Sequence, residues 1–270
     1  MAGGWDFTCL LPVWAGDDAE HFRAAVAAVA SASLPPNAIL ICQDGELPHP
    51  LAAAVAEARN DLGVRLVSNP GSRGLHHNLN HAMTQIRTPW VCRADADDID
   101  MPDRFQAQIG FLRSHPEVSV LGCAIIEFWP DGRSRQKPMP LKHEAIVRFA
   151  RWRNPINHMT AFFRTDAFLD CGGYPDIPMK EDYGLWLAMI ARDRRLANLA
   201  EPLVRARLGA DFHRRRSGLR NLASEWALFQ IKRATPGIGA GPAAAAFLAR
   251  SAALTLNTPA AVIYEGLLRA

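Results

Sequence analysis

The chain has 270 residues, of which 49% are hydrophobic and 21% are charged, and its formal net charge is +3. This balance is that of a globular protein with a substantial core, and it excludes long disordered segments. The positive charge lies in residues 201–270, with ten Lys or Arg against four Asp or Glu, and no basic stretch interleaves with aromatic residues, which argues against a nucleic-acid partner.

Strand-like and helix-like segments alternate over the first part of the chain. This alternation predicts a Rossmann-like α/β fold, in which a mainly parallel sheet is covered by helices on both faces. Ligands of such folds bind beyond the carboxyl ends of the strands, so we expect the functional residues there. The expected strands are 7–13, 38–42, 64–68 and 90–93, and the expected helices between them are 19–32, 50–62 and 75–86.

The later residues predict further elements and a C-terminal region of different character. We expect one domain over residues 1–210 and a basic helical extension over residues 211–270. In the extension, Arg214 to Arg216 precede a helical segment with Trp226, which either faces an anionic membrane or packs on the body or on a second subunit. The remaining elements are helices at 101–115, 142–152 and 179–192 and strands at 118–128, 160–164, 196–199 and 203–208.

Cysteine usage and the apolar stretches indicate a compartment. The five cysteines are widely spaced and mostly lie in apolar runs, as reduced core residues do. Residues 1–14 lack the basic segment and long apolar core of a signal peptide, and the apolar stretch 251–263 is too short to span a membrane. We therefore expect a cytoplasmic protein, peripheral at the inner face of the membrane if the extension binds lipid.

Three acidic residues follow the strand at 90–93. Alternate side chains of an extended segment share a face, so Asp95 and Asp97 are expected to point together at the edge of the sheet. Hard divalent cations take such oxygen ligands and complete their shell with substrate phosphates. The alternative, in which Asp98 or Asp100 caps the following helix, accounts for one acid and not for three.

A second acidic pair, Glu181 and Asp182, begins the helix at 179–192. Taken alone, carboxylates in the first turn of a helix are explained by capping. Here the pair follows a glycine-rich loop and an earlier acidic cluster, so one cluster can hold a metal ion while the other acts as a base. Earlier in the chain, Asp44 ends the second strand as a ligand contact or a turn residue, and Arg73 stands before a helix as a phosphate contact or a solvated side chain.

Seven short motifs, in this order and spacing, resemble the family 2 glycosyltransferases of the GT-A fold. Within that family they resemble the amylovoran-type enzymes that build bacterial exopolysaccharide, capsule or lipopolysaccharide. The resemblance covers about residues 6 to 210. Its motifs are Leu11-Pro12-Val13, Gln43-Asp44-Gly45, Arg73-Gly74-Leu75 with Asn80, Arg93 to Asp98, Asn154 to His158, Gly172-Gly173-Tyr174, and Glu181-Asp182-Tyr183.

The resemblance implies a nucleotide-sugar donor, expected to be a UDP-sugar, and a glycan or polyprenyl-diphosphate-linked acceptor. It implies that Asp44 contacts the nucleotide base, that Asp95 contacts the ribose or the metal, and that Asp97 ligates Mg²⁺ or Mn²⁺ on the diphosphate. Asp182 would be the catalytic base of an inverting displacement, and Glu181 would shape the acceptor site. The other positions that the resemblance assigns to substrate binding are Pro12, Val13, Arg73, Asn80, Arg93 and His158.

Two departures and two alternatives remain. Gln43 stands where the family usually has an acid, and Glu46 replaces a small hydroxyl residue, which leaves the identity of the bound base open. A phosphotransferase or phosphatase also uses acids after a strand, but the second acidic motif argues against it. A catalytically silent nucleotide-sugar-binding protein would keep the same pocket, although the presence of Asp182 favours turnover.

Overall fold

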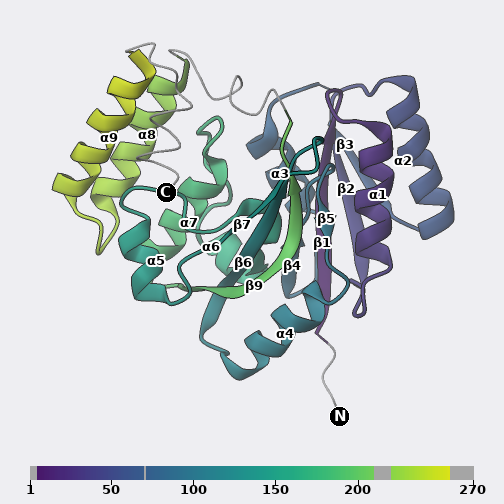
Figure 1. Ribbon diagram of the computed structural model, residues 1–270, viewed down its shortest axis with the longest axis horizontal. Coiled ribbons are helices and arrows are strands. Elements are labelled where there is room, and N and C mark those ends of the chain that lie inside the picture. Colours follow the sequence, from purple (N-terminus) through teal and green to yellow (C-terminus); the bar gives the residue numbers. More distant parts are fainter. Residues whose placement is uncertain (1–4, 70, 210–219, 256–270) are drawn as a thin grey trace.

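A computed structural model describes residues 5–69, 71–209 and 220–255 (Figure 1). The first half of the sheet is parallel, in the spatial order β3-β2-β1-β4. Its helices are α1 (Ala19–Ala30), α2 (His49–Leu62) and α3 (Leu75–Met83). Its strands are β1 (Phe7–Trp14), β2 (Ala38–Asp44), β3 (Arg65–Asn69) and β4 (Trp90–Arg93).

Side chains of β1 alternate between two buried apolar clusters, one on each face of the sheet. Leu10 packs in the cluster that contains Leu79 of α3, whereas Leu11 packs in the cluster that contains Phe22 of α1. A strand that is covered on both faces favours apolar residues at successive positions, which explains the apolar run from Cys9 to Val13 in β1. The predicted α/β fold with helices on both faces is confirmed.

The second half of the sheet is mixed. Strand β8 (Phe162–Arg164) joins β4 to β6 (Val118–Phe128) by antiparallel pairing, and β6 pairs in parallel with β9 (Arg195–Arg207). Two short strands complete the sheet: β5 (Ile99–Asp100) pairs with β9, and β7 (Ser134–Lys137) pairs with β6. Parallel pairing is therefore confined to β3-β2-β1-β4 and to β6-β9 within the described sheet.

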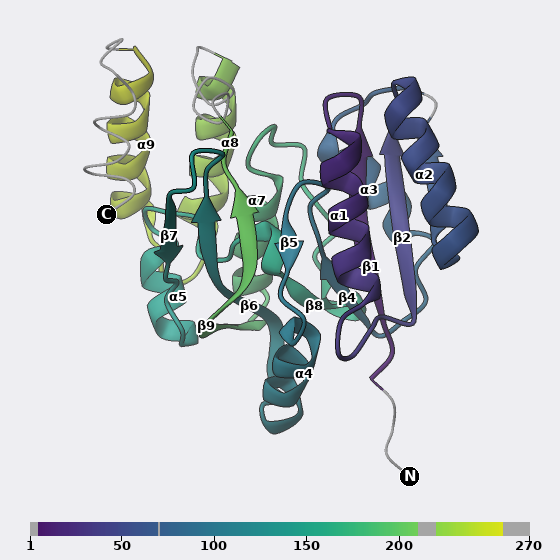
Figure 2. The ribbon, with the colours of Figure 1, turned by 45° about the vertical axis from the view of Figure 1, so that its right-hand side comes forward.

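The remaining helices cover this mixed half and extend beyond it. Figures 1 and 2 show α8 and α9 beside α7, at the opposite end of the molecule from α1 and α2. Leu228 of α8 and Ala243 of α9 are buried in the cluster that also holds Trp186 of α7. These helices are α4 (Arg104–Ser114), α5 (His143–Phe149), α6 (Thr165–Asp170), α7 (Glu181–Ala191), α8 (Arg220–Ala234) and α9 (Ala240–Thr255).

The C-terminal extension thus contacts the body through a shared apolar core. The boundary expected at residue 210 and the basic run Arg214 to Arg216 lie outside the described residues, so the division into two domains stays a prediction. Within the described ranges, no helix is both long enough and apolar enough to cross a membrane.

Several elements differ from the sequence-based expectation. The segments 196–199 and 203–208 form one strand, β9, with irregular register where Cys123 pairs with Leu199 and Ala124 pairs with Pro202. Helix α4 begins three residues later than expected because Asp100 pairs with β9 in extended conformation. Strands β5 and β7 and helix α6 were not expected.

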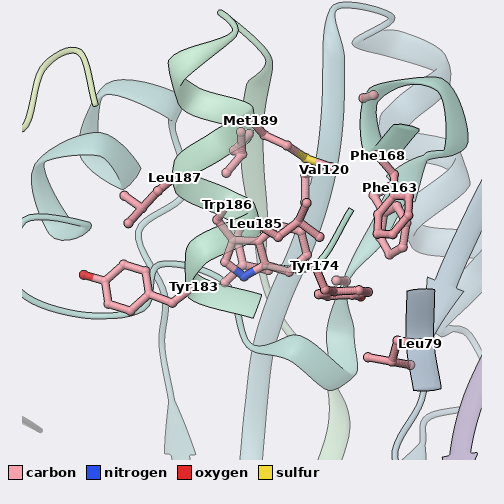
Figure 3. Close-up of a cluster of buried hydrophobic side chains, with 14 of the residues drawn as sticks. Leu79, Val120, Phe163, Phe168, Tyr174, Tyr183, Leu185, Trp186, Leu187 and Met189 are labelled. Atoms are coloured by element: carbon pink, nitrogen blue, oxygen red, sulfur yellow. The ribbon is translucent and has the colours of Figure 1, made fainter. Parts of the chain in front are cut away.

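Figure 3 shows the cluster of aromatic and aliphatic side chains around Trp186. The indole ring of Trp186 meets the rings of Phe163 and His158 edge to face, and Tyr174 contacts Phe168 in the same way. Burying a side chain such as Phe163 stabilises the fold by about 1.5–3 kcal/mol. The loop that carries Tyr174 is therefore fixed by packing.

Candidate active site

Three carboxylates meet just beyond the carboxyl end of β4. One oxygen from each of Asp95, Asp97 and Asp98 lies within 4.8 Å of the other two. Asp95 and Asp97 are half-buried, whereas Asp98 is only 6% exposed. The chain has left the strand here, and it turns with the N–H of Asp98 near the carbonyl of Asp95. A turn, and not the alternation of an extended strand, brings the acids together.

Asp98 is the member of this cluster with the most unusual environment. Its Oδ1 accepts the backbone N–H of Arg207 at 2.8 Å, while its buried Oδ2 has no hydrogen-bond partner in the described part of the chain. Burial, and then the negative charges of Asp95 and Asp97, raise the pKa of Asp98 well above its ordinary value. A buried carboxylate oxygen without a partner, beside two further carboxylates, is a setting that a hard divalent cation satisfies.

The capping alternative for these acids is wrong. Asp103 is the N-cap residue of α4, and its side chain makes no capping hydrogen bond. Asp100 instead forms a buried ion pair with Arg104, and Asp98 binds the backbone of β9. Both acids are therefore engaged by long-range or buried partners and do not cap the helix.

Arg93 lies beneath the cluster, with 1% of its surface exposed. Its guanidinium donates to the carboxylate of Asp95 and to the carbonyl of Ala94, and its own carbonyl accepts from Arg104 at 2.7 Å. The charge of Arg93 compensates the acids above it. Its predicted contact with substrate stays a prediction.

Asp17, in the loop after β1, is a further carboxylate near the cluster. Burial, reinforced by the negative charges of Asp97 and Asp95, raises the pKa of Asp17 to about 6. The hydrogen bond that its Oδ2 accepts from the backbone N–H of Trp14 acts in the opposite direction. Of the predicted donor-site positions nearby, Pro12 is half-buried, whereas the side chain of Val13 packs in the core. The Val13 side chain is therefore not available to a ligand, and its predicted substrate contact stays a prediction.

The structure brings Asp44 and Arg73 together at the carboxyl end of β2. Oδ1 of Asp44 accepts the backbone N–H of Arg73 at 3.0 Å, and its Oδ2 accepts the hydroxyl of Ser72 at 3.1 Å. The guanidinium of Arg73 is exposed and lies 3.3 Å from the Nε2 of His77. Asp44 thus holds the loop before α3 and leaves the Arg73 side chain facing solvent.

Asn80 docks the glycine-rich loop onto α3. Its amide accepts the N–H of Tyr174 at 2.9 Å and donates to the carbonyl of the same residue at 2.8 Å. Gly173 has a φ of +81°, and a Cβ there would lie 2.5 Å from the Asn80 Oδ1. Only glycine fits this approach. Both bonds of Asn80 serve the loop, and its predicted substrate contact stays a prediction.

Glu181 and Asp182 begin α7 in different environments. Asp182 is half-buried, and its carboxylate accepts the amide N–H of Asn154 at 2.5 Å and the backbone N–H of Tyr183 at 2.7 Å. Glu181 is 7% exposed. Burial raises the pKa of its carboxyl to about 7, and the negative charge of Asp182 acts in the same direction. Asp182 is the more accessible of the two.

His158 and Tyr174 lie between the two acidic sites. The Nε2 of His158 is 2.9 Å from the Tyr174 hydroxyl. Burial, reinforced by the positive charge of Arg93, lowers the pKa of His158 well below its usual value, so the ring is neutral at physiological pH. Burial raises the pKa of Tyr174, on which the charges of both Arg93 and Asp182 act. Tyr174 therefore lies within electrostatic reach both of Arg93, which contacts Asp95, and of Asp182.

Sequence reasoning missed several of these roles. Asn154 stood in a motif without a role, and its bond to Asp182 was not foreseen. Asp17 lies in no motif, and Asp98 was counted with the acidic run but was not assigned as a metal ligand. The signal available for Asn154 was its place in the Asn154 to His158 motif of the family resemblance.

The architecture is that of a GT-A glycosyltransferase. S. aureus TarS 1-349, solved in complex with UDP-GlcNAc, matches with a TM-score of 0.73 at 15% identity, over 97% of this chain and 76% of that chain. A family model described as Glycosyl transferase family 2 matches residues 15–172.

Two relatives extend this similarity over most of the sequence. The amylovoran biosynthesis glycosyltransferase AmsE of Erwinia amylovora is 33% identical over 86% of this chain and 88% of its own length. The UDP-Gal:alpha-D-GlcNAc-diphosphoundecaprenol beta-1,3-galactosyltransferase of Escherichia coli is 26% identical over 81% of this chain and 80% of its own length. The chain belongs to glycosyltransferase family 2, as the sequence motifs predicted.

The raised pKa of Glu181 predicts a pH-dependent stability. A carboxyl whose pKa rises from 4.5 in the unfolded chain to about 7 in the native one stabilises the fold below pH 4.5, and this contribution is lost as the pH rises through 7. Between pH 5 and pH 8, the wild type should lose about 2–3 kcal/mol of unfolding free energy relative to Glu181→Gln in urea titrations. Parallel pH profiles for the two proteins would contradict the assignment.

Proposed function

We propose that the protein is an inverting glycosyltransferase that moves a sugar from a UDP-sugar to a hydroxyl of a glycan or a polyprenyl-diphosphate-linked acceptor in bacterial surface polysaccharide biosynthesis. The observation that carries the proposal is the placement of two acidic centres in one site. Asp95, Asp97 and Asp98 lie at the sheet edge, and Asp182 stands at the start of α7, held by Asn154.

The comparisons support the donor and acceptor classes. The relative from Erwinia amylovora is named for amylovoran biosynthesis, and the Escherichia coli relative is named for a UDP-galactose donor and a diphosphoundecaprenol-linked acceptor. The structural match was solved with UDP-GlcNAc. Membership of the family removes the support for a phosphotransferase or a phosphatase.

The residues of the acidic cluster fit a bound Mg²⁺ or Mn²⁺. Asp97, with Asp95 and Asp98, would hold the ion, since their oxygens converge and one buried oxygen of Asp98 has no partner within the described ranges. When bound, the cation supplies neutralisation of the negative charge that develops on the departing diphosphate, a contribution of several kcal/mol in such sites.

The donor is held by residues at the ends of β1 and β2. Asp44 would accept a hydrogen bond from the nucleotide base, next to the backbone of Pro12 and Val13 in the adjacent strand. The exposed guanidinium of Arg73 would approach the phosphates, since the Asp44 carboxylate already fixes the loop on which it stands.

Asp182 would act as the base. It takes the proton from the acceptor hydroxyl while that oxygen attacks the anomeric carbon from the face opposite the diphosphate, so the configuration inverts in one displacement. The amide of Asn154 orients the carboxylate, and neutral His158 would offer a hydrogen bond to the acceptor. Glu181, buried behind Asp182, would shape the acceptor site.

Removal of one cluster carboxylate tests the metal assignment. Asp97→Asn should weaken cation and UDP-sugar binding together while the melting temperature stays near that of the wild type, because the side chain serves binding and not packing. Calorimetric titration of UDP-sugars with and without Mn²⁺ measures both affinities, and Asp61→Asn on the exposed face of α2 is the matched control. EDTA should mimic the loss; full transfer activity in metal-free buffer would rule the assignment out.

Substitution of the base should separate chemistry from binding. Asp182→Asn keeps the shape of the side chain but cannot accept a proton, so donor affinity should survive while turnover falls by roughly 10² to 10⁴. Glu181→Gln should be milder, since Glu181 does not receive the proton. The measurement is steady-state transfer from a radiolabelled donor to a lipid-linked acceptor. Undiminished turnover in Asp182→Asn would assign the proton transfer to another residue.

The C-terminal helices present an apolar surface that fits an anionic membrane. Trp226 is 51% exposed on α8 and Leu248 is 65% exposed on α9, and the rings of Phe229 and Phe247 pack against Trp226. In the sequence, the basic run Arg214 to Arg216, which lies outside the described residues, precedes α8. Aromatic side chains together with a basic run are typical of peripheral attachment, because the positive charge is attracted to anionic lipid. We propose that this surface docks the enzyme at the membrane that carries its acceptor.

Surface substitutions test the membrane contact without removing the packed helices. Trp226→Ser combined with Leu248→Ser should reduce co-sedimentation with phosphatidylserine vesicles, and raised salt should reduce it further by screening. Leu62→Ser, at an apolar side chain of α2 with 48% exposure, is the control. Unchanged co-sedimentation, with altered sedimentation velocity, would assign the surface to a second subunit.

A further inference from the structure

The C-terminal helices α8 and α9 place buried charges against the segment that leads into the candidate base. Glu225 of α8 forms an ion pair with Lys180, with 2.8 Å between its Oε1 and the Nζ of Lys180. Lys180 directly precedes Glu181. Arg250 of α9 approaches the same carboxylate oxygen at 3.5 Å. Glu225 is buried, and Lys180 is largely so, with a side-chain exposure of 17%. The pair therefore joins the extension to the first turn of α7.

The same helices also bind the backbone that leads to Asn154. The Nζ of Lys232 donates to the carbonyl of Arg151 at 3.0 Å, and Arg250 donates to the carbonyl of Trp152 at 2.6 Å. In return, the guanidinium of Arg151 donates to the carbonyl of Gly237, between α8 and α9, at 2.8 Å. Hydrogen bonds from the C-terminal helices therefore hold Arg151 and Trp152, which lie just before Asn154 in the chain.

Tyr183, the residue after Asp182, is held in the same way. Its hydroxyl donates to the carbonyl of Ala150 at 2.6 Å, and the ammonium of Lys232 lies 4.6 Å from the centre of its ring. Figure 3 shows the Tyr183 hydroxyl pointing away from Trp186, at the margin of the apolar cluster. Both chain neighbours of the Glu181-Asp182 pair therefore depend on contacts from or beside α8.

Packing alone does not require this arrangement. Buried charges carry a desolvation cost that apolar side chains of similar size avoid, so they are weak contributors to stability. Here the charged contacts converge on the two segments that carry Asp182 and Asn154. The residue before Lys180, Met179, has a φ of 68°, in the left-handed region that non-glycine residues rarely adopt, so this turn is held by its surroundings.

We propose that Glu225 is a positioning residue for catalysis. Through its ion pair with Lys180, and with Arg250 as a second partner, it sets the direction in which α7 presents Asp182 to the acceptor. The inference rests on the proposed role of Asp182 as the base. It makes the C-terminal helices part of the catalytic apparatus, although their described residues supply no carboxylate to the reacting centre.

The test compares Glu225→Gln, Lys180→Met and the double variant with the wild type. Each single change should lower kcat for sugar transfer about tenfold, because a base displaced by a fraction of an ångström loses its alignment. The donor Kd should stay within about twofold, and the double variant should be no slower than the slower single variant, since both remove one interaction. Arg23→Gln, which breaks the exposed pair with Glu57 between α1 and α2, is the control ion pair.

Further measurements separate positioning from folding. Lys180→Arg keeps the charge and should restore most of kcat, whereas a merely structural loss would lower the melting temperature without changing kcat of the folded fraction. Lys180→Met keeps the test open if Glu225→Gln does not fold. Unchanged kcat in both folded single variants, or fully additive losses in the double variant, would overturn the inference.

The same assay distinguishes this inference from the proposed function. If Asp182→Asn loses transfer while Glu225→Gln keeps it, only the positioning role fails. If the wild type binds a UDP-sugar and transfers sugar to no acceptor, the proposed function fails, whatever the variants show.

Discussion

The buried guanidinium of Arg93 is the interaction on which the site depends. Three carboxylates cannot be crowded at a strand end in a low-dielectric setting unless positive charge compensates them. Arg93 supplies part of that charge from below through Asp95, and the backbone of Arg207 supplies a donor to Asp98. The backbone N–H of Arg93 donates to the carbonyl of Ala161, just before β8. The remaining imbalance of negative charge faces the position where a cation and a diphosphate would bind.

The parallel and the mixed half of the sheet contribute different residues to the site. The parallel half ends at Asp44 and the acidic cluster, where the donor would lie, and the mixed half supplies the loops around His158 and Asp182. Asn80 ties the halves together by docking the Tyr174 backbone on α3. Because the Tyr174 hydroxyl in turn contacts His158, a displacement of this loop would also displace the His158 ring.

The sequence predicted the parallel half well because apolar runs and helical segments alternate there with clear breaks. It also predicted that the carboxylates of Asp95 and Asp97 lie together, although a turn and not the alternation of a strand brings them there. It did not predict β5, whose two residues carry no periodicity, or the continuity of β9 through a bulge at Pro202. The orientation of Asp98 depends on Arg207, and the Lys180 pair depends on Glu225, so only tertiary packing reveals either.

The stereochemistry of the product tests the central claim most directly, because a single carboxylate base opposite the departing diphosphate permits only one outcome. Transfer from a donor whose sugar is α-linked to UDP should give a β-glycoside, which the coupling constant of the anomeric proton reports in the NMR spectrum of the product. An α-glycoside would contradict the account. It would require either attack by the acceptor from the same face that the diphosphate leaves, or a second displacement with a protein group bonded to the sugar between the two steps.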